Sequence, residues 1–279
     1  MKEFKGKVAV ITGGASGLGL AIAHRAAKEG MKLVLADVEQ AALTRAEDEL
    51  KRAGAEVIGV RTDVSKAADV GALAKKTLNT FGKVHLVCNN AGVGGIRLKA
   101  WEASVEDWQW VLGVNVWGVI HGVRTFTPIM LAQDEPCHMV NTASVAGLLS
   151  PSGMSVYNVS KHAVVTLSET LYQDLALAQA KLKVSVLCPA FVATGIWNSA
   201  RNRPSELSAG IDADEEKRRA EEVRTVLEKG KLTPADVADM VFAAIEAEKF
   251  YILTHPKIKA VIETRMQDIL LERNPTFTN

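Results

Sequence analysis

The chain of 279 residues is long enough for one large domain or two smaller ones. About half of its residues (48%) are hydrophobic, and 33 basic residues nearly cancel 32 acidic ones, so the basic excess typical of nucleic-acid and membrane-surface binders is missing. No apolar run approaches the roughly 20 residues of a membrane-spanning helix, and the N-terminal run is too short for a secretory signal, so we expect a cytoplasmic protein. Cys88, Cys137 and Cys188 lie far apart in or beside apolar runs, which indicates buried reduced thiols and no metal site.

Short β-branched runs alternate with longer helical patterns along the whole chain. Strands are predicted over residues 7–12, 32–37, 56–63, 84–90, 138–144 and 184–190. Helices are predicted over 17–29, 42–54, 68–82, 105–132 and 155–180, the third of them starting at Asp63 or Ser65. This alternation predicts an α/β fold of the Rossmann type: a doubly wound parallel sheet between two helical layers, in a single domain over 1–279. Ligands of such folds bind at the carboxyl ends of the strands.

A glycine-rich segment follows the first strand. "TGGASGLG" (12–19) has glycines at 13, 17 and 19, which let the backbone turn tightly and lie against a diphosphate. The helix that follows would direct its free N–H groups at the negative charge. The segment therefore predicts a dinucleotide site, and a tight turn without a ligand is the alternative.

The end of the second strand carries an acidic residue. A carboxylate at Asp37 accepts hydrogen bonds from the adenosine ribose hydroxyls and repels a 2′-phosphate. The next residue, Val38, offers no cation to such a phosphate. This pattern favours NAD over NADP as the cofactor, and a helix cap at Asp37 is a compatible alternative role.

Three motifs occur in a characteristic order. "TGGASGLG" fits the pattern TGxxxGxG, "NNAG" (89–92) follows the fourth strand, and Tyr157-x-x-x-Lys161 follows the fifth. Together they resemble the short-chain dehydrogenase/reductase family in its single-domain branch, over roughly residues 5–195. The glycine spacing differs from the TGxxGxxG of the extended branch, which includes sugar-nucleotide epimerases.

The resemblance implies the residues of an active site. Asn115, Ser144, Tyr157 and Lys161 match the catalytic set of the family, whereas Asn89 is expected to tie neighbouring strands together. The residues that match its cofactor contacts are Gly13, Ser16, Gly17, Leu18, Gly19, Asp37, Asp63, Val64, Asn90, Ala91, Gly92, Tyr157, Lys161, Pro189, Val192 and Thr194.

The matched residues imply a division of labour. A tyrosine near its ordinary pKa of about 10 is a poor base, so we expect Lys161 and a positively charged nicotinamide to lower the pKa of Tyr157 by roughly three units. Tyr157 then takes the alcohol proton as hydride leaves for NAD⁺, and Ser144 hydrogen-bonds the substrate oxygen. Lys161 also holds the nicotinamide ribose. Asn115 fixes a water that links Lys161 to solvent, or is only a helix-kink residue.

Two segments depart from the family pattern. The usual Pro-Gly is Pro189-Ala190 here, which would strain the loop if position 190 needs a positive φ. The C-terminus has a predicted strand and helix over about 249–272 in place of a glycine-rich strand. This difference puts the tetramer contact of many relatives in doubt.

Substrate specificity is expected from segments above the nicotinamide, including a helical lid over about 195–230. The substrate expected is a hydrophobic secondary alcohol or ketone, aromatic or alicyclic. Core or interface positions are the alternative for the candidate pocket residues, which are Gly94, Leu148, Met154, Ile196 and Trp197.

The long helical patterns over 105–132 and 155–180 are apolar on more faces than one sheet contact requires. They predict a homodimer or homotetramer built from these helices. The leading expectation is an NAD-dependent alcohol dehydrogenase or ketone reductase acting on a small molecule, with no nucleic-acid or membrane partner. An NADH-sensing regulator without turnover, and a related dehydratase or epimerase, are the alternatives.

Overall fold

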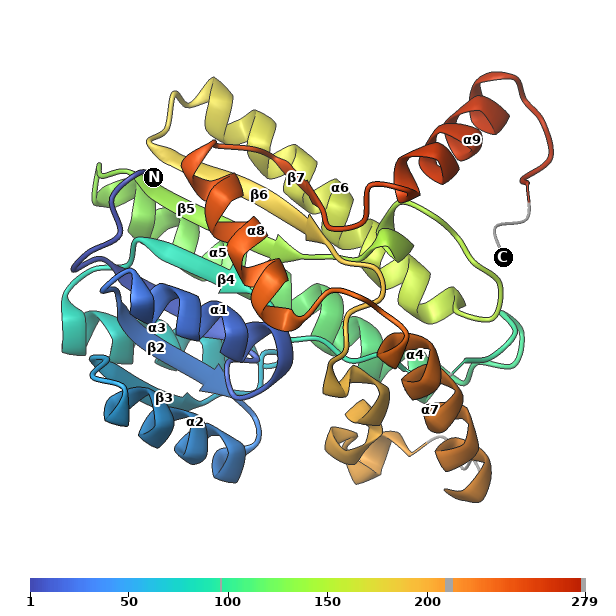
Figure 1. Ribbon diagram of the computed structural model, residues 1–279, viewed down its shortest axis with the longest axis horizontal. Coiled ribbons are helices and arrows are strands. Elements are labelled where there is room, and N and C mark those ends of the chain that lie inside the picture. The colour runs from blue at the N-terminus through green and yellow to red at the C-terminus, as the bar shows by residue number, and fades with distance from the viewer. Residues whose placement is uncertain (96, 209–212, 277–279) are drawn as a thin grey trace.

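The computed structural model describes residues 1–95, 97–208 and 213–276. In these residues a parallel sheet has the strand order β3-β2-β1-β4-β5-β6-β7 (Figure 1). The predicted α/β fold is confirmed. The strands of the sheet are β1 (Val8–Thr12), β2 (Lys32–Asp37), β3 (Val57–Arg61), β4 (Leu86–Asn89), β5 (Cys137–Thr142), β6 (Leu182–Cys188) and β7 (Tyr251–Leu253).

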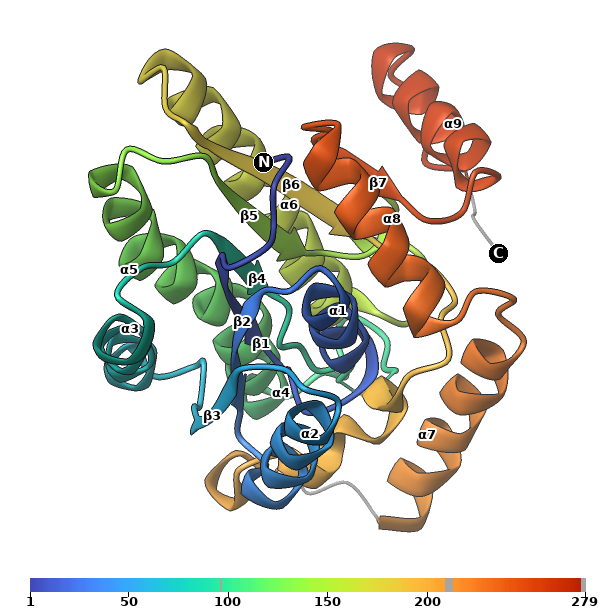
Figure 2. The ribbon, with the colours of Figure 1, turned by 60° about the vertical axis from the view of Figure 1, so that its left-hand side comes forward.

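Helices cover both faces of the sheet. One layer holds α1, α2 and α8, and the other holds α3, α5 and α6 (Figures 1 and 2). The α-helices are α1 (Gly17–Lys28), α2 (Gln40–Arg52), α3 (Ala67–Phe81), α4 (Val105–Leu112), α5 (Gly118–Ala132), α6 (Ser155–Leu177), α7 (Ala213–Glu228), α8 (Pro234–Glu246) and α9 (Ile258–Leu270). Shorter 3₁₀ turns are η2 (Val145–Gly147), η3 (Gly195–Asn202) and η4 (Ser205–Leu207).

Alternate side chains of each central strand enter different cores. In β2, Leu33 and Leu35 pack with Ile22 and Phe242 under α1 and α8, whereas Val34 packs on the opposite face with residues of α3 and α5. Both sets are fully buried, since successive side chains of a strand point to opposite faces. This two-sided burial explains why the strands are apolar almost throughout.

Polar residues also join the strands internally. The Nδ2 of Asn89 donates to the Oδ1 of Asn141 at 2.8 Å, and the Nδ2 of Asn141 donates to Ser168 of α6 at 3.0 Å. The predicted strand-tying role of Asn89 is confirmed. Cys88, Cys137 and Cys188 are buried and unpaired.

The helical pattern predicted over 105–132 contains an irregular turn. It consists of α4, a π-helical turn η1 (Gly113–Trp117) and α5 in direct succession. A π-helical turn inserts one extra residue into an α-helix and often marks a functional site. Asn115 lies inside this turn and is fully buried.

Two helix boundaries were predicted wrongly or missed. The third helix starts at Ala67 and not at Asp63 or Ser65, because Asp63 accepts hydrogen bonds from the Ser65 N–H (3.1 Å) and hydroxyl (2.7 Å) in a turn before the helix. Helix α8 was not predicted. Its signal was present, since Thr233 and Asp236 form a capping box around a proline at the first helical position.

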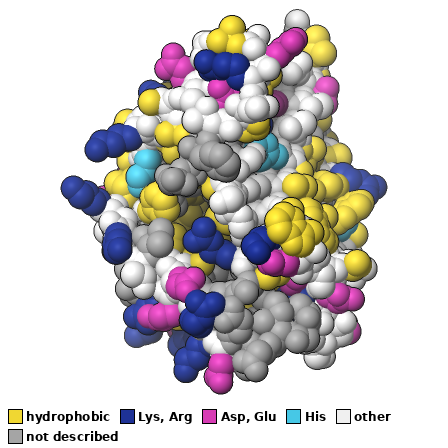
Figure 3. All heavy atoms as spheres, turned by 90° about the vertical axis from the view of Figure 1, so that its right-hand side faces the viewer, with side chains coloured by type: hydrophobic (Ala, Val, Ile, Leu, Met, Phe, Trp, Pro, Cys, Tyr) yellow, Lys and Arg dark blue, Asp and Glu magenta, His cyan; other side chains and the backbone are white. Residues whose placement is uncertain are grey.

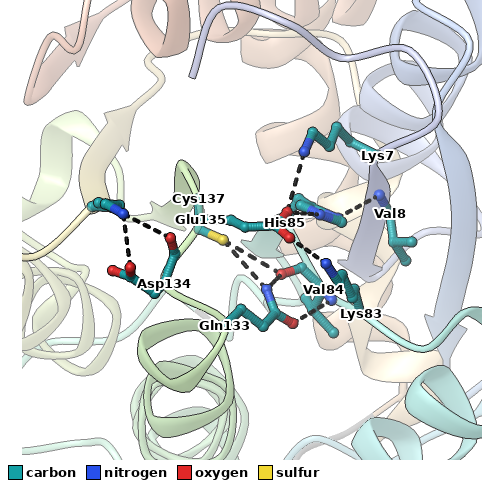
Figure 4. Close-up of polar contacts among 10 residues, drawn as sticks. Lys7, Val8, Lys83, Val84, His85, Gln133, Asp134, Glu135 and Cys137 are labelled. Atoms are coloured by element: carbon teal, nitrogen blue, oxygen red, sulfur yellow. Dashed lines mark hydrogen bonds and ion pairs between the residues drawn. The ribbon is translucent and has the colours of Figure 1, made fainter.

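A cluster of charged side chains fastens the amino ends of β1 and β4 (Figure 4). Glu135 bonds to Lys7 (3.3 Å), to Lys83 and to the Nε2 of His85 (3.1 Å), whose Nδ1 accepts from the Val8 N–H (3.0 Å). These hydrogen bonds, the one from Lys83 first, hold the pKa of Glu135 at about 2. Burial lowers the pKa of His85. We call Lys7, Lys83, His85 and Glu135 the amino-edge cluster.

The chain ends in a strand and a projecting helix. β7 pairs with β6 at the sheet edge, and α9 stands away from the body (Figure 1). Both lie within the stretch predicted for them, about 249–272. In the described residues, no helix is both long and apolar enough to cross a membrane. Nor does the described part of the chain hold a group of three or more His, Cys, Asp or Glu side chains placed for a metal ion.

Candidate active site

A cleft of about 490 Å³ lies at the carboxyl ends of the strands. Figure 3 views this side of the molecule, where hydrophobic side chains gather in and around a hollow. The lining combines residues that follow six different strands, as the fold predicts. The predicted site residues that line the cleft are Gly13, Ser16, Gly17, Leu18, Asp37, Asp63, Val64, Asn90, Ala91, Gly92, Ser144, Tyr157, Lys161, Pro189, Val192, Thr194 and Ile196.

The glycine segment forms a cradle after β1. Gly13 and Gly17 have positive φ angles of 62° and 54°, and a Cβ on Gly19 would lie 2.0 Å from the Gly13 carbonyl oxygen. Helix α1 begins at Gly17, its first turn has no acidic residue, and the side chain of Ser16 makes no cap bond. The first N–H groups of a helix have no partner inside it. The geometry therefore fits a diphosphate group lying against the backbone.

The loop after β4 is fixed to this cradle. The Thr12 hydroxyl accepts from the N–H groups of Asn90 (2.9 Å) and Ala91 (3.1 Å), and the Asn90 Nδ2 donates to the Thr12 carbonyl (3.0 Å). Asn90 thus lines the cleft with its side chain turned to the backbone of β1. Its position makes the cradle and the loop after β4 one rigid unit.

Asp37 lies at one end of the cleft. Its carboxylate accepts from the N–H groups of Ala15 (3.1 Å) and Glu39 (3.1 Å), and burial raises its pKa. The residue that precedes α2 is Glu39, so Asp37 does not cap that helix. Arg61 is the register partner of Asp37 on β3 and lines the same cleft. Sequence reasoning considered only Val38 as a source of charge and missed this arginine, which the parallel register brings alongside.

The hydroxyls and the amine of the predicted catalytic set meet at the other end. Ser144 donates to the Pro189 carbonyl at 3.3 Å, and the phenol of Tyr157 has the Ser144 hydroxyl as a hydrogen-bond partner. The Nζ of Lys161 donates to the Thr142 carbonyl at 3.1 Å and lies 5.5 Å from the centre of the Tyr157 ring. The helical spacing of four residues therefore brings Tyr157 and Lys161 to one face, as predicted.

Burial shifts the pKa values of both members of this pair. Burial raises the pKa of Tyr157 to about 12, and the contact with Ser144 only partly opposes this effect. Burial also lowers the pKa of Lys161 to about 8. Desolvation disfavours both charged forms in the protein alone, so the predicted depression of the Tyr157 pKa, which also requires the positively charged nicotinamide, stays a prediction.

The side chain of Asn115 forms hydrogen bonds with the loop after β4 and with α6. Its Oδ1 accepts from the Val93 N–H (2.8 Å), and its Nδ2 donates to the Val93 carbonyl (2.9 Å) and to Ser160 (3.1 Å). A Cβ on Gly92 would lie 3.3 Å from this Oδ1 and 3.4 Å from the Nζ of Lys161. Asn115 therefore fixes the loop after β4 directly beside Lys161.

Ala190 is accommodated without strain. Its φ angle is not positive, and its N–H lies 3.4 Å from the hydroxyl of Thr254. The loop that follows β6 therefore does not need a glycine at position 190.

Two of the predicted pocket residues lie at the cleft. Ile196 lines it, and a Cβ on Gly94 would meet the Ile196 carbonyl at 3.3 Å. The Gly94 N–H donates to the Ser199 hydroxyl at 3.0 Å. The loop after β4 and the turn η3 therefore meet here.

The other three predicted pocket residues lie outside the cleft. Leu148 packs against the buried cluster that contains Val164 and Val186, so it belongs to the core. Met154 caps α6 and pairs with Leu98 in an isolated bridge. Trp197 lines a second cavity of about 430 Å³ between η3, α7 and α8. These three side chains therefore do not line the cleft.

Several cleft residues were missed from the sequence. Trp110 and Gln109 of α4 line the cleft, although they lie far from any motif. Glu39, Arg201 and Asn202 also line it and contact one another. Their only sequence signal was that Glu39 follows Asp37 closely.

Comparisons with known proteins agree with this geometry. Residues 7–205 match the family model described as short chain dehydrogenase. A crystal structure of a short chain dehydrogenase/reductase from Burkholderia phymatum in complex with NAD is 56% identical, covers 100% of this chain and 99% of its own, and has a TM-score of 0.96.

Curated relatives are similar over nearly the whole chain. A CLA biosynthesis dehydrogenase/reductase of Lactiplantibacillus plantarum is 36% identical over 99% of this chain and 97% of its own. A 1-deoxy-11-beta-hydroxypentalenate dehydrogenase of Streptomyces exfoliatus is 31% identical over 94% of this chain and 88% of its own. The chain belongs to the short-chain dehydrogenase/reductase family.

Proposed function

We propose that the protein is an NAD-dependent oxidoreductase that moves a hydride between NAD(H) and a secondary alcohol or ketone. The observation that carries the proposal is the layout of one cleft. It has Asp37 at one end, the glycine cradle in the middle, and Ser144, Tyr157 and Lys161 at the other end. The relative from Burkholderia phymatum, which is named as an NAD complex, supports NAD as the cofactor.

The cradle residues would hold the cofactor. The N–H groups at the start of α1 would face the diphosphate, Asp37 would accept from the adenosine ribose, and Asp63 and Val64 would border the adenine. When bound, NAD⁺ accepts the hydride, and its positive charge favours a phenolate at Tyr157.

Proton transfer is assigned to Tyr157. During oxidation its phenolate takes the alcohol proton, and during reduction its phenol returns a proton to the carbonyl oxygen. Ser144, held by the Pro189 carbonyl, hydrogen-bonds that oxygen where negative charge develops. Lys161 stabilises the phenolate and binds the nicotinamide ribose. Asn115 positions the loop beside Lys161, and the water relay to solvent assigned to it remains part of the proposal.

The substrate proposed is hydrophobic. Val93, Trp110, Ile196 and Leu207 line the cleft, and the first two are almost completely buried. The segment over about 195–230 acts as a lid. Its described parts, η3, η4 and α7, follow β6 directly, and residues 209–212 lie outside the described residues.

Exposed apolar side chains on the long helices support an oligomer. Val105 and Trp117 lie 65% and 51% exposed along the segment 105–132, and Leu177 lies 85% exposed at the end of α6. We propose a homodimer at least, packed through these helices. Light scattering of the purified protein tests this assembly.

The test of the function follows NADH absorbance with a panel of secondary alcohols and either NAD⁺ or NADP⁺. Turnover with NAD⁺ that falls about 10² to 10⁴-fold in Tyr157→Phe is expected. A preference for NADP⁺ would contradict the role of Asp37. Tight NADH binding without turnover on any alcohol would favour the regulator, and a redox-neutral product would favour the dehydratase or epimerase.

A further inference from the structure

The turn η3 crosses the mouth of the cleft. It begins directly after Thr194, beside the cradle, and its residues Ile196, Ser199, Arg201 and Asn202 line the cleft in succession. We call Gly195–Asn202 the strap. The strap therefore borders the cleft along its length.

The strap is anchored at two ends of the cleft. Near the loop after β4, the Ser199 hydroxyl accepts from the Gly94 N–H at 3.0 Å. At the opposite end, the Nη2 of Arg201 and the Nδ2 of Asn202 donate to the same oxygen, the Oε1 of Glu39, at 2.6 Å and 2.8 Å.

Glu39 belongs to the adenosine end of the cleft. Its N–H donates to the Asp37 carboxylate, the group assigned to the ribose. Its side chain therefore joins the ribose end to a segment that lies more than 160 residues later in the chain, because the two hydrogen bonds span 162 and 163 residues. These two hydrogen bonds therefore connect segments that are distant along the backbone.

The contact is charged and only half-buried. The hydrogen bond from Asn202 first, and then Arg201, lower the pKa of Glu39, so the carboxylate is ionised at neutral pH. The Nη1 of Arg201 donates to the Asn198 carbonyl at 2.6 Å, which orients the guanidinium toward Glu39. The side chains of Arg201 and Glu39 remain 37% and 31% exposed. Such a pair is weak enough to open repeatedly and strong enough to bias a nearby equilibrium.

We propose that Glu39 is a positioning residue that, with Arg201 and Asn202, clasps the strap over the adenosine end of the cleft and slows cofactor release. The proposal rests on the proposed NAD-dependent function. In the closed state the strap blocks the path of the adenosine half, and an open clasp frees it. Loss of the clasp therefore raises the NADH dissociation rate without touching the reacting atoms.

The experiment measures NADH dissociation from the full-length protein by stopped-flow fluorescence. Glu39→Gln and Arg201→Gln are each expected to speed dissociation about three- to fivefold, and Asn202→Ala somewhat less. The double variant Glu39→Gln/Arg201→Gln should release NADH no faster than either of its single variants, because both substitutions break the same contact. Added salt should accelerate NADH release from the wild type but not from Glu39→Gln or Arg201→Gln, which lack the ion pair.

Asp134→Asn is the matched control. Asp134 forms an ion pair with Lys181 at 2.8 Å on the surface, away from the cleft, and its loss should leave NADH dissociation unchanged. Unchanged dissociation in Glu39→Gln, with NADH binding intact, would overturn the clasp alone. A wild-type protein that binds no NADH would overturn the proposed function and the clasp with it.

Discussion

Ionisable groups lie in opposite environments at the two ends of the parallel strands, which we call the amino edge and the carboxyl edge. At the amino edge, Glu135 bonds to two lysines and a histidine, and its pKa is about 2. At the carboxyl edge, Lys161 is buried beside a backbone carbonyl and Tyr157 is partly buried beside a hydroxyl, and both pKa values shift toward the neutral form. The first arrangement contributes to folding. The second is expected of groups that exchange protons, since buried titratable groups without counter-charges cluster at functional sites.

The largest expected effect comes from filling the glycine cradle at the carboxyl edge. In Gly19→Ala the new Cβ would lie 2.0 Å from the Gly13 carbonyl oxygen, so the cradle must shift. Such overpacking costs about 1–3 kcal/mol, and NADH affinity should fall about tenfold to a hundredfold or more. Fluorescence titration with NADH checks the loss.

A matched glycine tests whether position matters more than residue type. A Cβ on Gly71, within α3, meets no heavy atom within 4 Å. Gly71→Ala should therefore raise the free energy of unfolding by about 0.5–1 kcal/mol and leave NADH affinity unchanged. Equal affinity losses in the two variants would contradict the cradle.

The next effect concerns the pH dependence of turnover. Burial raises the pKa of Tyr157 to about 12 in the protein alone, and bound NAD⁺ would favour the phenolate. The phenolate fraction of the complex therefore grows as the pH rises toward the pKa of Tyr157. Alcohol oxidation should therefore accelerate as the pH rises from 7 to 10, and ketone reduction should not. Initial rates in both directions measure this difference. Oxidation that slows with rising pH would exclude Tyr157 as the base.

The amino-edge cluster should make stability, and not turnover, depend on pH. The folded-state pKa values of His85 and Glu135 are both lowered, so the unfolded chain binds more protons between the ordinary and the folded values. The free energy of unfolding should therefore fall as the pH drops below about 6.5 for His85, and from about 4.5 toward 2 for Glu135. Urea unfolding at several pH values measures this.

Glu135→Gln separates the two contributions at the amino edge. It should flatten the loss of stability below pH 4.5 and keep the loss attributed to His85, whose pKa is lowered by burial and not by Glu135. Turnover at neutral pH should be unchanged, because the cluster lies at the edge opposite the cleft. An unaltered pH profile would show that Glu135 contributes nothing to acid sensitivity.

The smallest effect is expected from the exposed pair beside this cluster. Asp134→Asn removes the ion pair with Lys181. The side chains of Asp134 and Lys181 are 81% and 53% exposed. Surface pairs of this kind contribute about 0–1 kcal/mol. Asparagine also tolerates the positive φ of 49° at this position. A change in the free energy of unfolding above 1 kcal/mol would show that exposure is a poor guide at this edge.

Features that depend on residues close together in the sequence could be predicted, whereas features that depend on tertiary contacts could not. The cradle, Asp37 and the Tyr157–Lys161 pair lie at strand ends or on one helix, so spacing alone places them. The pKa of Tyr157 depends on burial, which no motif records. Arg61 entered the cleft through strand register.

The segments above the cleft were predictable only in outline. Leu148, Met154 and Trp197 lie in turns and caps without a repeating pattern, so nothing in their spacing indicated which way each side chain points. The contact between Glu39 and Arg201 joins two such irregular segments. By contrast, helix α8 could have been predicted, because Thr233 and the residues after it form a typical helix start.

The extra residue in the π-helical turn Gly113–Trp117 sets the rotation of α4 about the helix axis relative to α5. Deleting one residue there would restore a regular α-helix and rotate α4 by about 100° relative to α5. Asp107, which accepts from Arg203 at 2.7 Å, and Trp110, which lies 5.1 Å beneath the same guanidinium, would then face a new direction. An insertion or deletion at this turn would therefore redirect one wall of the cleft while the sheet stays the same.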